Sequence, residues 1–197
     1  MALHDLTKSS NYLDKVGWRE SVYQKASVDQ QGEAIPWITY PALAFIEPRL
    51  HTEMAIFEYG SGNSTIWWAK HVAQVVSCEH DAIWHRKMVP LLPENVQYIY
   101  AELNDGYPEV ILQYQREFDI VVIDGRKRVQ CVRNAMGAMK PDGVIIWDNT
   151  NRDRYQPGIE YLHANGFRQV DFWGMVAIVN ELSCTSVFYR PDNRLGI

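Results

Sequence analysis

Four acidic residues each come directly after a short apolar run: Glu58, Glu79, Asp124 and Asp148. An acid at the end of a buried parallel strand lies at the carboxyl edge of the sheet, where open α/β proteins bind their ligands. Carboxylates gathered at one edge raise one another's pKa and are unfavourable unless donors or cations accompany them. Together they indicate a binding site, although any one of them could instead cap the following helix.

A turn of small residues follows Glu58 and provides the second sign of a binding site. Gly60 and Gly62 allow the backbone to approach a ligand closely and to adopt positive φ. The polar residues around them leave N–H groups at the start of a helix, where these can hydrogen-bond a carboxylate or phosphate. Glu79 follows about 20 residues later, the place from which an acid binds a ribose diol. Residues 55–81 therefore predict a nucleoside-containing ligand.

The sequence of the turn narrows the choice of nucleoside. Thr65 stands where a dinucleotide-binding G-x-G-x-x-G motif has its third glycine, and the Gly-Lys-Ser/Thr ending of a P-loop is absent. The string E-Y-G-S-G-N-S at 58–64 instead resembles the first motif of class I S-adenosylmethionine-dependent methyltransferases. A plain connecting turn is the alternative. The resemblance implies S-adenosylmethionine as the cofactor, bound by Glu58, Gly60, Ser61, Gly62, Asn63, Ser64, Thr65, Glu79, His80 and Asp124.

A second constellation consists of Asp124 and the pair Asp148-Asn149. Carboxylate and amide oxygens are hard ligands that suit Mg²⁺ or Ca²⁺. The pattern resembles the cation-dependent, catechol-type O-methyltransferases, which have an aspartate after the fourth strand, an Asp-Asn pair after the fifth and a lysine three residues after the first aspartate. The resemblance implies Asp124, Asp148 and Asn149 as Mg²⁺ ligands, with Lys127 and Asp124 as catalytic residues.

Simpler interpretations of these residues remain open. Asp124 could contact the cofactor or cap a helix, and Asp148-Asn149 could be a turn, which both residue types favour. Lys127 has basic neighbours and could belong to a patch that binds an anionic substrate; these neighbours are Arg126, Arg128 and Arg133.

Strands and helices alternate along the chain and would position these groups. Apolar runs predict strands at 55–57, 75–78, 96–100, 118–124 and 144–147, and two alternating segments at 168–173 and 186–189 follow them. Periodic segments predict intervening helices, among them 108–116 and 129–139, and a turn at 140–143. The fold class predicted is α/β: a mostly parallel seven-stranded sheet with helices on both faces and a C-terminal antiparallel hairpin, which resembles the Rossmann-like class I methyltransferase fold.

Length and composition place these elements in one domain. The 197 residues predict a single unit, with residues 1–50 as a helical cap on the substrate side and 51–197 as the cofactor-binding core. A net charge of −5 provides no general attraction to nucleic acid or to an anionic membrane. Three scattered cysteines and the lack of a membrane-spanning run predict a cytoplasmic protein. A homo-oligomer is left open.

The sequence as a whole predicts an S-adenosylmethionine-dependent methyltransferase that methylates an oxygen atom of a small molecule, with metal assistance as the catechol-type resemblance implies. The Asn-Pro-Pro-Tyr motif of amino-group methyltransferases is absent, which favours oxygen over nitrogen as the acceptor atom. Two other classes remain: a nucleoside-cofactor oxidoreductase of the NAD type, and an interaction module that keeps the fold without turnover.

Overall fold

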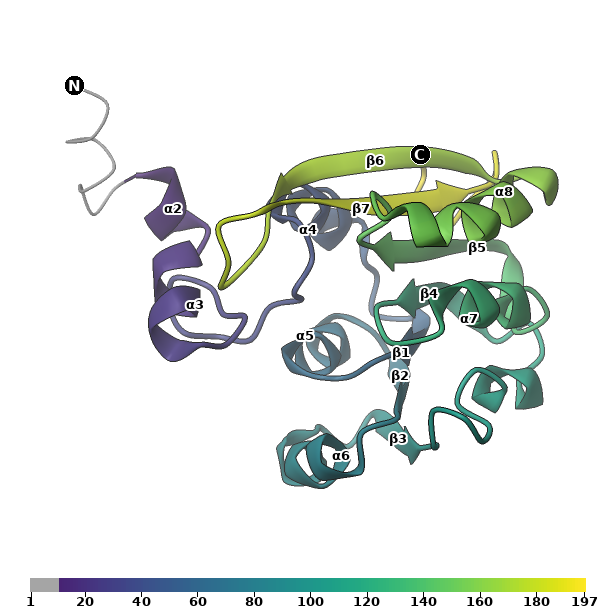
Figure 1. The fold of residues 1–197 in the computed structure, drawn as a ribbon, viewed down its shortest axis with the longest axis horizontal. Coiled ribbons are helices and arrows are strands. Elements are labelled where there is room, and N and C mark those ends of the chain that lie inside the picture. The colour runs from purple at the N-terminus through teal and green to yellow at the C-terminus, as the bar shows by residue number, and fades with distance from the viewer. Residues whose placement is uncertain (1–10) are drawn as a thin grey trace.

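The structure is a computed structural model that describes residues 11–197, and its centre is a seven-stranded sheet (Figure 1). The strand order is β3-β2-β1-β4-β5-β7-β6. The first five strands run parallel, and β7 is antiparallel to both of its neighbours, β5 and β6. This confirms the predicted sheet and hairpin. The strands are β1 Ala55–Tyr59, β2 Gln74–Glu79, β3 Val96–Tyr100, β4 Phe118–Ile123, β5 Met139–Asp148, β6 Arg168–Met175 and β7 Leu182–Tyr189.

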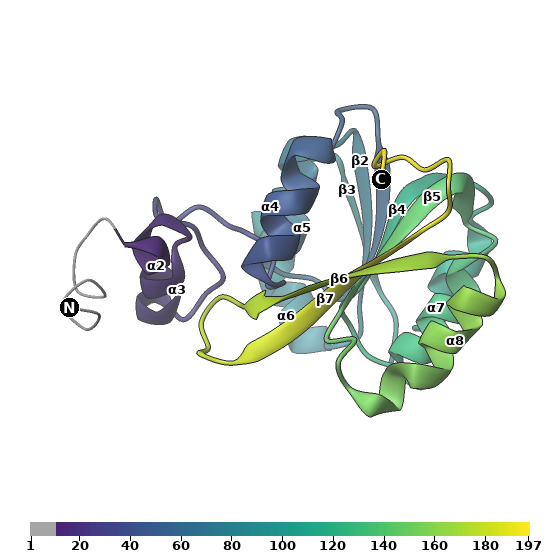
Figure 2. The same ribbon diagram turned by 90° about the horizontal axis from the view of Figure 1, so that it is seen from above.

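Helices cover both faces of this sheet (Figure 2). One face carries α4 Tyr40–Ile46, α5 Asn63–His71 and α6 Ala82–Met88, and the other carries α7 Arg128–Ala135 and α8 Gln156–Ala164. Two short helices, α2 Tyr12–Lys15 and α3 Trp18–Gln24, lie outside the layer formed by α4–α6. Single 3₁₀ turns occur at Glu47–Arg49, Val89–Leu91, Val110–Gln113 and Asp153–Tyr155.

The core lies on both sides of the sheet because its central strands are covered on both faces. Every residue of β4 is buried, as expected for a parallel strand written as a continuous apolar run. Trp67 and Trp68 of α5 pack into the core on one face, and Trp147 of β5 packs against α8 on the other. Among residues 11–197, no helix has the length and apolar character needed to cross a bilayer.

The strand order positions the site. The chain passes from β1 to β2 and β3 on one side, and then crosses back to place β4 on the other side of β1. Connections that leave β1 and β4 in opposite directions open a crevice at the carboxyl ends of these strands, which is where such sheets bind ligands. The residues that follow β1 and β4 therefore border one opening.

Two predicted elements were wrong. Residues 140–143 are not a turn before the fifth strand but lie within β5, where the pairing with β4 shifts register. Pro141 has no N–H to donate, so the chain bulges there without ending the strand. Residues 108–116 form only the 3₁₀ turn Val110–Gln113. The carbonyl of Pro108, which a helix would use, instead accepts from the side chains of Tyr59 and Asn134.

Candidate cofactor and acceptor site

The acid at the end of β1 lies buried behind the glycine turn. Three side chains donate to the Glu58 carboxylate: Thr65 at 2.5 Å, Ser77 at 2.9 Å and Trp68 at 3.1 Å. Burial raises the pKa of Glu58 to about 7, against the lowering effect of the hydroxyl donors. Glu58 thus holds together the turn, α5 and β2 from behind, and it does not line the opening.

The turn itself is shaped by close backbone contact between two loops. Gly60 has φ of 92°, and a Cβ there would lie 3.1 Å from the backbone of Gly125, which follows β4. A Cβ on Gly125 would lie 1.9 Å from the Tyr107 hydroxyl, so no side chain fits. Thr65 closes the turn, because its hydroxyl accepts from the Gly62 amide while its own amide donates to the Gly62 carbonyl.

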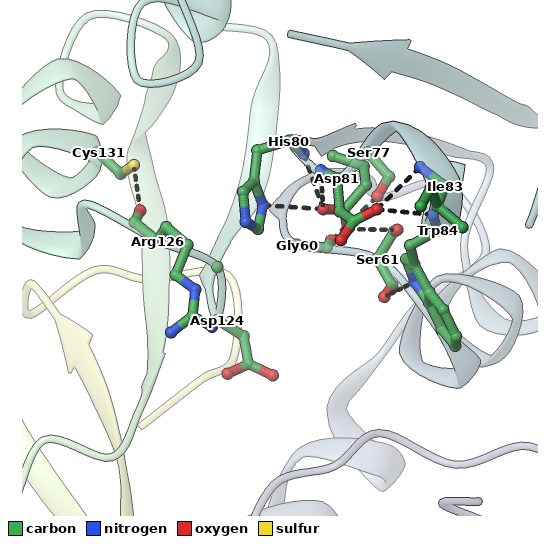
Figure 3. Close-up of polar contacts among 12 residues, drawn as sticks. Gly60, Ser61, Ser77, His80, Asp81, Ile83, Trp84, Asp124, Arg126 and Cys131 are labelled. Carbon is green, nitrogen blue, oxygen red and sulfur yellow. Dashed lines mark hydrogen bonds and ion pairs between the residues drawn. The ribbon is translucent and has the colours of Figure 1, made fainter. Parts of the chain in front are cut away.

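Glu79, at the end of β2, faces the turn and is held in place by it. Its Oε2 accepts from Ser61 Oγ at 2.8 Å, and its Oε1 accepts from the amides of His80 and Asp81. The His80 ring nitrogen Nδ1 lies 2.8 Å from the same Oε1. Figure 3 shows Ser61 and Trp84 together on one side of the open space, with Asp124 and Arg126 across it. Each carboxylate oxygen has two lone pairs, so Oε2 of Glu79 keeps acceptor capacity for a ligand hydroxyl.

On the β4 side, Arg128 joins the loops that follow β4 and β5. Its guanidinium donates to Asp124 Oδ1 at 2.8 Å and to Asn149 Oδ1 at 3.3 Å. It also donates to the main-chain carbonyls of Asp124, Gly125 and Asp148. Burial raises the pKa of Asp124, and the Arg128 guanidinium opposes that shift.

Asp148, which is buried, is the second acid on this side. Its side chain is almost wholly buried and accepts from Thr185 Oγ1 at 2.6 Å. Burial, followed by the charge of Asp124, raises the pKa of Asp148 to about 7. The next residue, Asn149, has φ of 59° and donates to Ser183 of β7 at 3.0 Å.

One cavity of about 950 Å³ connects these two groups of residues. The turn from Gly60 to Ser64, Glu79 and His80 line one half, and Asp124, Asp148 and Asn149 line the other. Residues 24–27, at the end of α3 and just after it, and the β6–β7 connection complete its wall. The N-terminal segment is tied to the turn, since Asn63 Nδ2 donates to the Ser27 carbonyl at 2.7 Å.

Some residues of the wall had no signal in the sequence. The segment between β6 and β7 is neither periodic nor rich in chemical groups, yet it contributes Ile178, Val179 and Glu181. For Trp84 the only signal was its position shortly after Glu79. Its indole donates to the Ser61 carbonyl at 2.9 Å. The contact of Arg128 with Asp124 had a weak signal, because the two residues are four positions apart across a helix start.

Lys127 lies outside this cavity. It is exposed, precedes α7 as its N-cap residue with φ of 49°, and lines an adjoining hollow with other basic residues. Its role as a catalytic base stays a prediction.

The residues fit S-adenosylmethionine better than they fit Mg²⁺. An open glycine turn with no room for side chains, a strand-end acid and an adjoining cavity suit a nucleoside ligand. In contrast, two of the three predicted metal ligands, Asp124 and Asn149, already accept from Arg128. A guanidinium in contact with both oxygens leaves an unsuitable environment for a second cation. Within residues 11–197, no group of three or more acidic, histidine or cysteine side chains is arranged to hold a metal.

Solved structures share this fold at low sequence identity. A precorrin-6y C5,15-methyltransferase from Geobacter metallireducens is 15% identical, with a TM-score of 0.59 over 76% of this chain and 88% of its own. An rRNA methylase from Streptococcus thermophilus is 14% identical, with a TM-score of 0.57 over 79% and 99%. A spermidine synthase from Thermotoga maritima is 13% identical, with a TM-score of 0.57 over 80% and 58%. The fold is therefore the Rossmann-like fold of class I methyltransferases.

Part of the chain also matches a family model. Residues 57–150 match a family model described as a methyltransferase domain. A comparison with proteins of curated function gave no match. The match over residues 57–150 and the fold together support a class I, S-adenosylmethionine-dependent methyltransferase, in agreement with the class predicted from the glycine turn.

Proposed function

We propose that this protein transfers a methyl group from S-adenosylmethionine to a hydroxyl oxygen of a small molecule. The observation that carries the proposal is the single cavity of about 950 Å³ shared by the glycine turn and the acids Asp124 and Asp148. Ligand cavities commonly measure about 300–1,000 Å³. A cavity of this size that also holds the cofactor leaves room for a small acceptor.

The half of the cavity lined by the glycine turn, Glu79 and His80, here called the cofactor half, binds the nucleoside in this proposal. The Gly60–Ser64 turn lies against the methionine part, Glu79 accepts from the ribose hydroxyls, and His80 borders the adenosine. When bound, S-adenosylmethionine supplies a methyl group on a positively charged sulfur. Glu58 acts as a positioning residue, since its three donors fix the turn from behind.

The other half of the cavity, lined by Asp124, Asp148 and Asn149 and here called the acceptor half, supplies a base. A hydroxyl oxygen that takes up a methyl group must lose its proton, and a general base works best with a pKa near the working pH. Asp148 has a pKa of about 7 and lines this half of the cavity. The proton passes from the acceptor hydroxyl to Asp148, while Asp124, held by Arg128, orients the hydroxyl. No metal takes part in this arrangement.

Calorimetric titration with S-adenosylhomocysteine tests the cofactor half. We expect binding to the wild-type protein, and binding at least about tenfold weaker for Glu79→Ala, because a buried ligand hydroxyl loses its charged acceptor. Glu94→Ala is the matched control, since Glu94 is exposed and outside the cavity. Binding of NAD without binding of S-adenosylhomocysteine would instead support an oxidoreductase.

Turnover tests the acceptor half. A panel of hydroxylated small molecules is incubated with S-adenosylmethionine, once with Mg²⁺ and once with EDTA. Equal methylation in both conditions supports a metal-free base, and methylation only with Mg²⁺ contradicts it. Cofactor binding with no methylation of any acceptor in the panel would favour the non-catalytic interaction module.

A further inference from the structure

A second hollow of about 550 Å³ adjoins the cofactor cavity on the side of α7. Nine residues line it, and five of them are basic. Gly125, Arg126 and Arg128 line both the hollow and the cavity, so the two spaces are contiguous. The basic residues of the hollow are Arg126, Lys127, Arg128, Arg133 and Arg154, and we call them the basic cluster.

Among the described residues, four members of the basic cluster have no carboxylate partner. Arg128 is the exception, and it donates to five oxygen atoms of the loops after β4 and β5. Within residues 11–197, the other four form no ion pair, and all four are exposed. Like charges held together are unfavourable unless an opposite charge joins them. The whole chain has a net charge of −5, so the positive charge of this cluster is opposite in sign to that of the protein.

Aromatic rings fix the directions of two of these side chains. The Arg154 guanidinium lies 5.0 Å from the centre of the Tyr155 ring, and its Nη2 donates to the Tyr155 hydroxyl at 3.2 Å. The Arg133 guanidinium lies 5.8 Å from the ring of Tyr161. An arginine stacked on a ring keeps donors free for a planar or tetrahedral oxyanion and loses less side-chain entropy on binding. The cluster also surrounds the start of α7, whose dipole favours negative charge.

We propose that the four exposed residues of the basic cluster bind the oxyanion of an anionic methyl acceptor, a phosphate or carboxylate group, while the acceptor hydroxyl reaches Asp124 and Asp148 through the shared wall. This rests on the proposed function and gives it a substrate class: a small hydroxylated molecule with a negatively charged group. Arg126, which lines both spaces, lies between the two ends of that acceptor. Figure 3 shows Arg126 and Asp124 on the same side of the open space.

The test is a titration of the S-adenosylhomocysteine-loaded protein with inorganic pyrophosphate, and in parallel with succinate. The variants are Arg133→Gln and Arg154→Gln, separately and combined, with Arg168→Gln on β6 as the matched control because it is exposed and outside both spaces. We expect each variant of the cluster to weaken anion binding about tenfold and the control to leave it unchanged. The better-bound anion distinguishes phosphate from carboxylate.

Three results would overturn the proposal. One is that neither anion binds a protein that binds S-adenosylhomocysteine. Another is that an anion binds equally well to the combined variant, whose folding is verified by its thermal unfolding. The third is that a short single-stranded RNA binds through the same arginines more tightly than either anion, which would make the cluster a nucleic-acid contact. Failure to bind S-adenosylhomocysteine is a separate result and counts against the proposed function alone.

Discussion

Arg128 uses all the hydrogen-bonding capacity that an arginine side chain has. Its guanidinium has five N–H donors, and the structure gives it five acceptors in the loops after β4 and β5. The result is a fixed positive charge among Asp124, Asp148 and Asn149, in the position where the sequence predicted a metal ion. Because every donor is engaged, Arg128 holds the acceptor half in shape and leaves ligand binding to its neighbours.

The proposed role of Asp148 predicts a specific kinetic defect. Asp148→Asn keeps the acceptor for Thr185 but cannot take up a proton. We expect kcat to fall by about 10²–10⁴-fold while S-adenosylhomocysteine affinity stays the same. We also expect the wild-type rate to rise with pH through about 7, the pKa of Asp148, and the variant to lack this rise. Activity close to wild type, or loss of cofactor binding, would show that Asp148 is not the base.

At the scale of elements, an ion cluster joins the start of β4 to the start of β5 and the C-terminal tail. Asp119 is fully buried and pairs with Lys140 at 2.8 Å and Arg194 at 2.5 Å, and it accepts from the Ala55 amide of β1. Removing a buried carboxylate that accepts from this many donors is costly, because Lys140 loses its counter-charge and the Ala55 amide loses its acceptor. The cluster lies at the amino ends of the strands, opposite the site.

We therefore expect Asp119→Ala to lower the free energy of unfolding by about 3 kcal/mol. Asp142→Ala is the control, since Asp142 is 43% exposed and lies 3.8 Å from Arg194, and we expect it to cost less than about 1 kcal/mol. Urea unfolding measures both values. Equal effects of the two substitutions would mean that the buried cluster contributes no more than a surface pair does.

The strands were predictable because a buried parallel strand consists mostly of consecutive apolar residues, as in Phe118–Ile123. The connections were less predictable. The Pro108 carbonyl is occupied by Tyr59 and Asn134, side chains that are 49 and 26 positions away, so local periodicity gave the wrong element there. The same holds for the site. Its strand-end acids could be predicted from the sequence, whereas the part of the cavity wall formed by the β6–β7 connection depends on tertiary packing alone.

The stability of the whole molecule should depend on pH through its buried acids. The pKa of Glu58 is 4.5 in an exposed reference and about 7 in the fold. The folded protein therefore holds a proton that the unfolded chain releases between these values. The resulting stabilisation is fully present below the unfolded pKa and is lost as the pH rises through about 7. A shift of this size corresponds to about 3 kcal/mol.

Glu58→Gln removes this titration and keeps hydrogen-bonding groups for Thr65, Ser77 and Trp68. We expect the wild-type protein to lose unfolding free energy between about pH 5 and about pH 8, and the variant to lose much less. Urea unfolding at both values measures the difference. The same pH dependence in both proteins would mean that Glu58 titrates normally in the fold.

The hydrogen bonds around Glu58 also have a thermodynamic consequence for ligand binding. Thr65 and Ser77 fix the turn to α5 and β2, and the Gly60 backbone is confined against Gly125. These contacts are made entirely within the protein, so the conformational entropy of the turn is lost when the chain folds. Cofactor binding then does not bear that entropic cost, and more of the interaction energy appears as affinity.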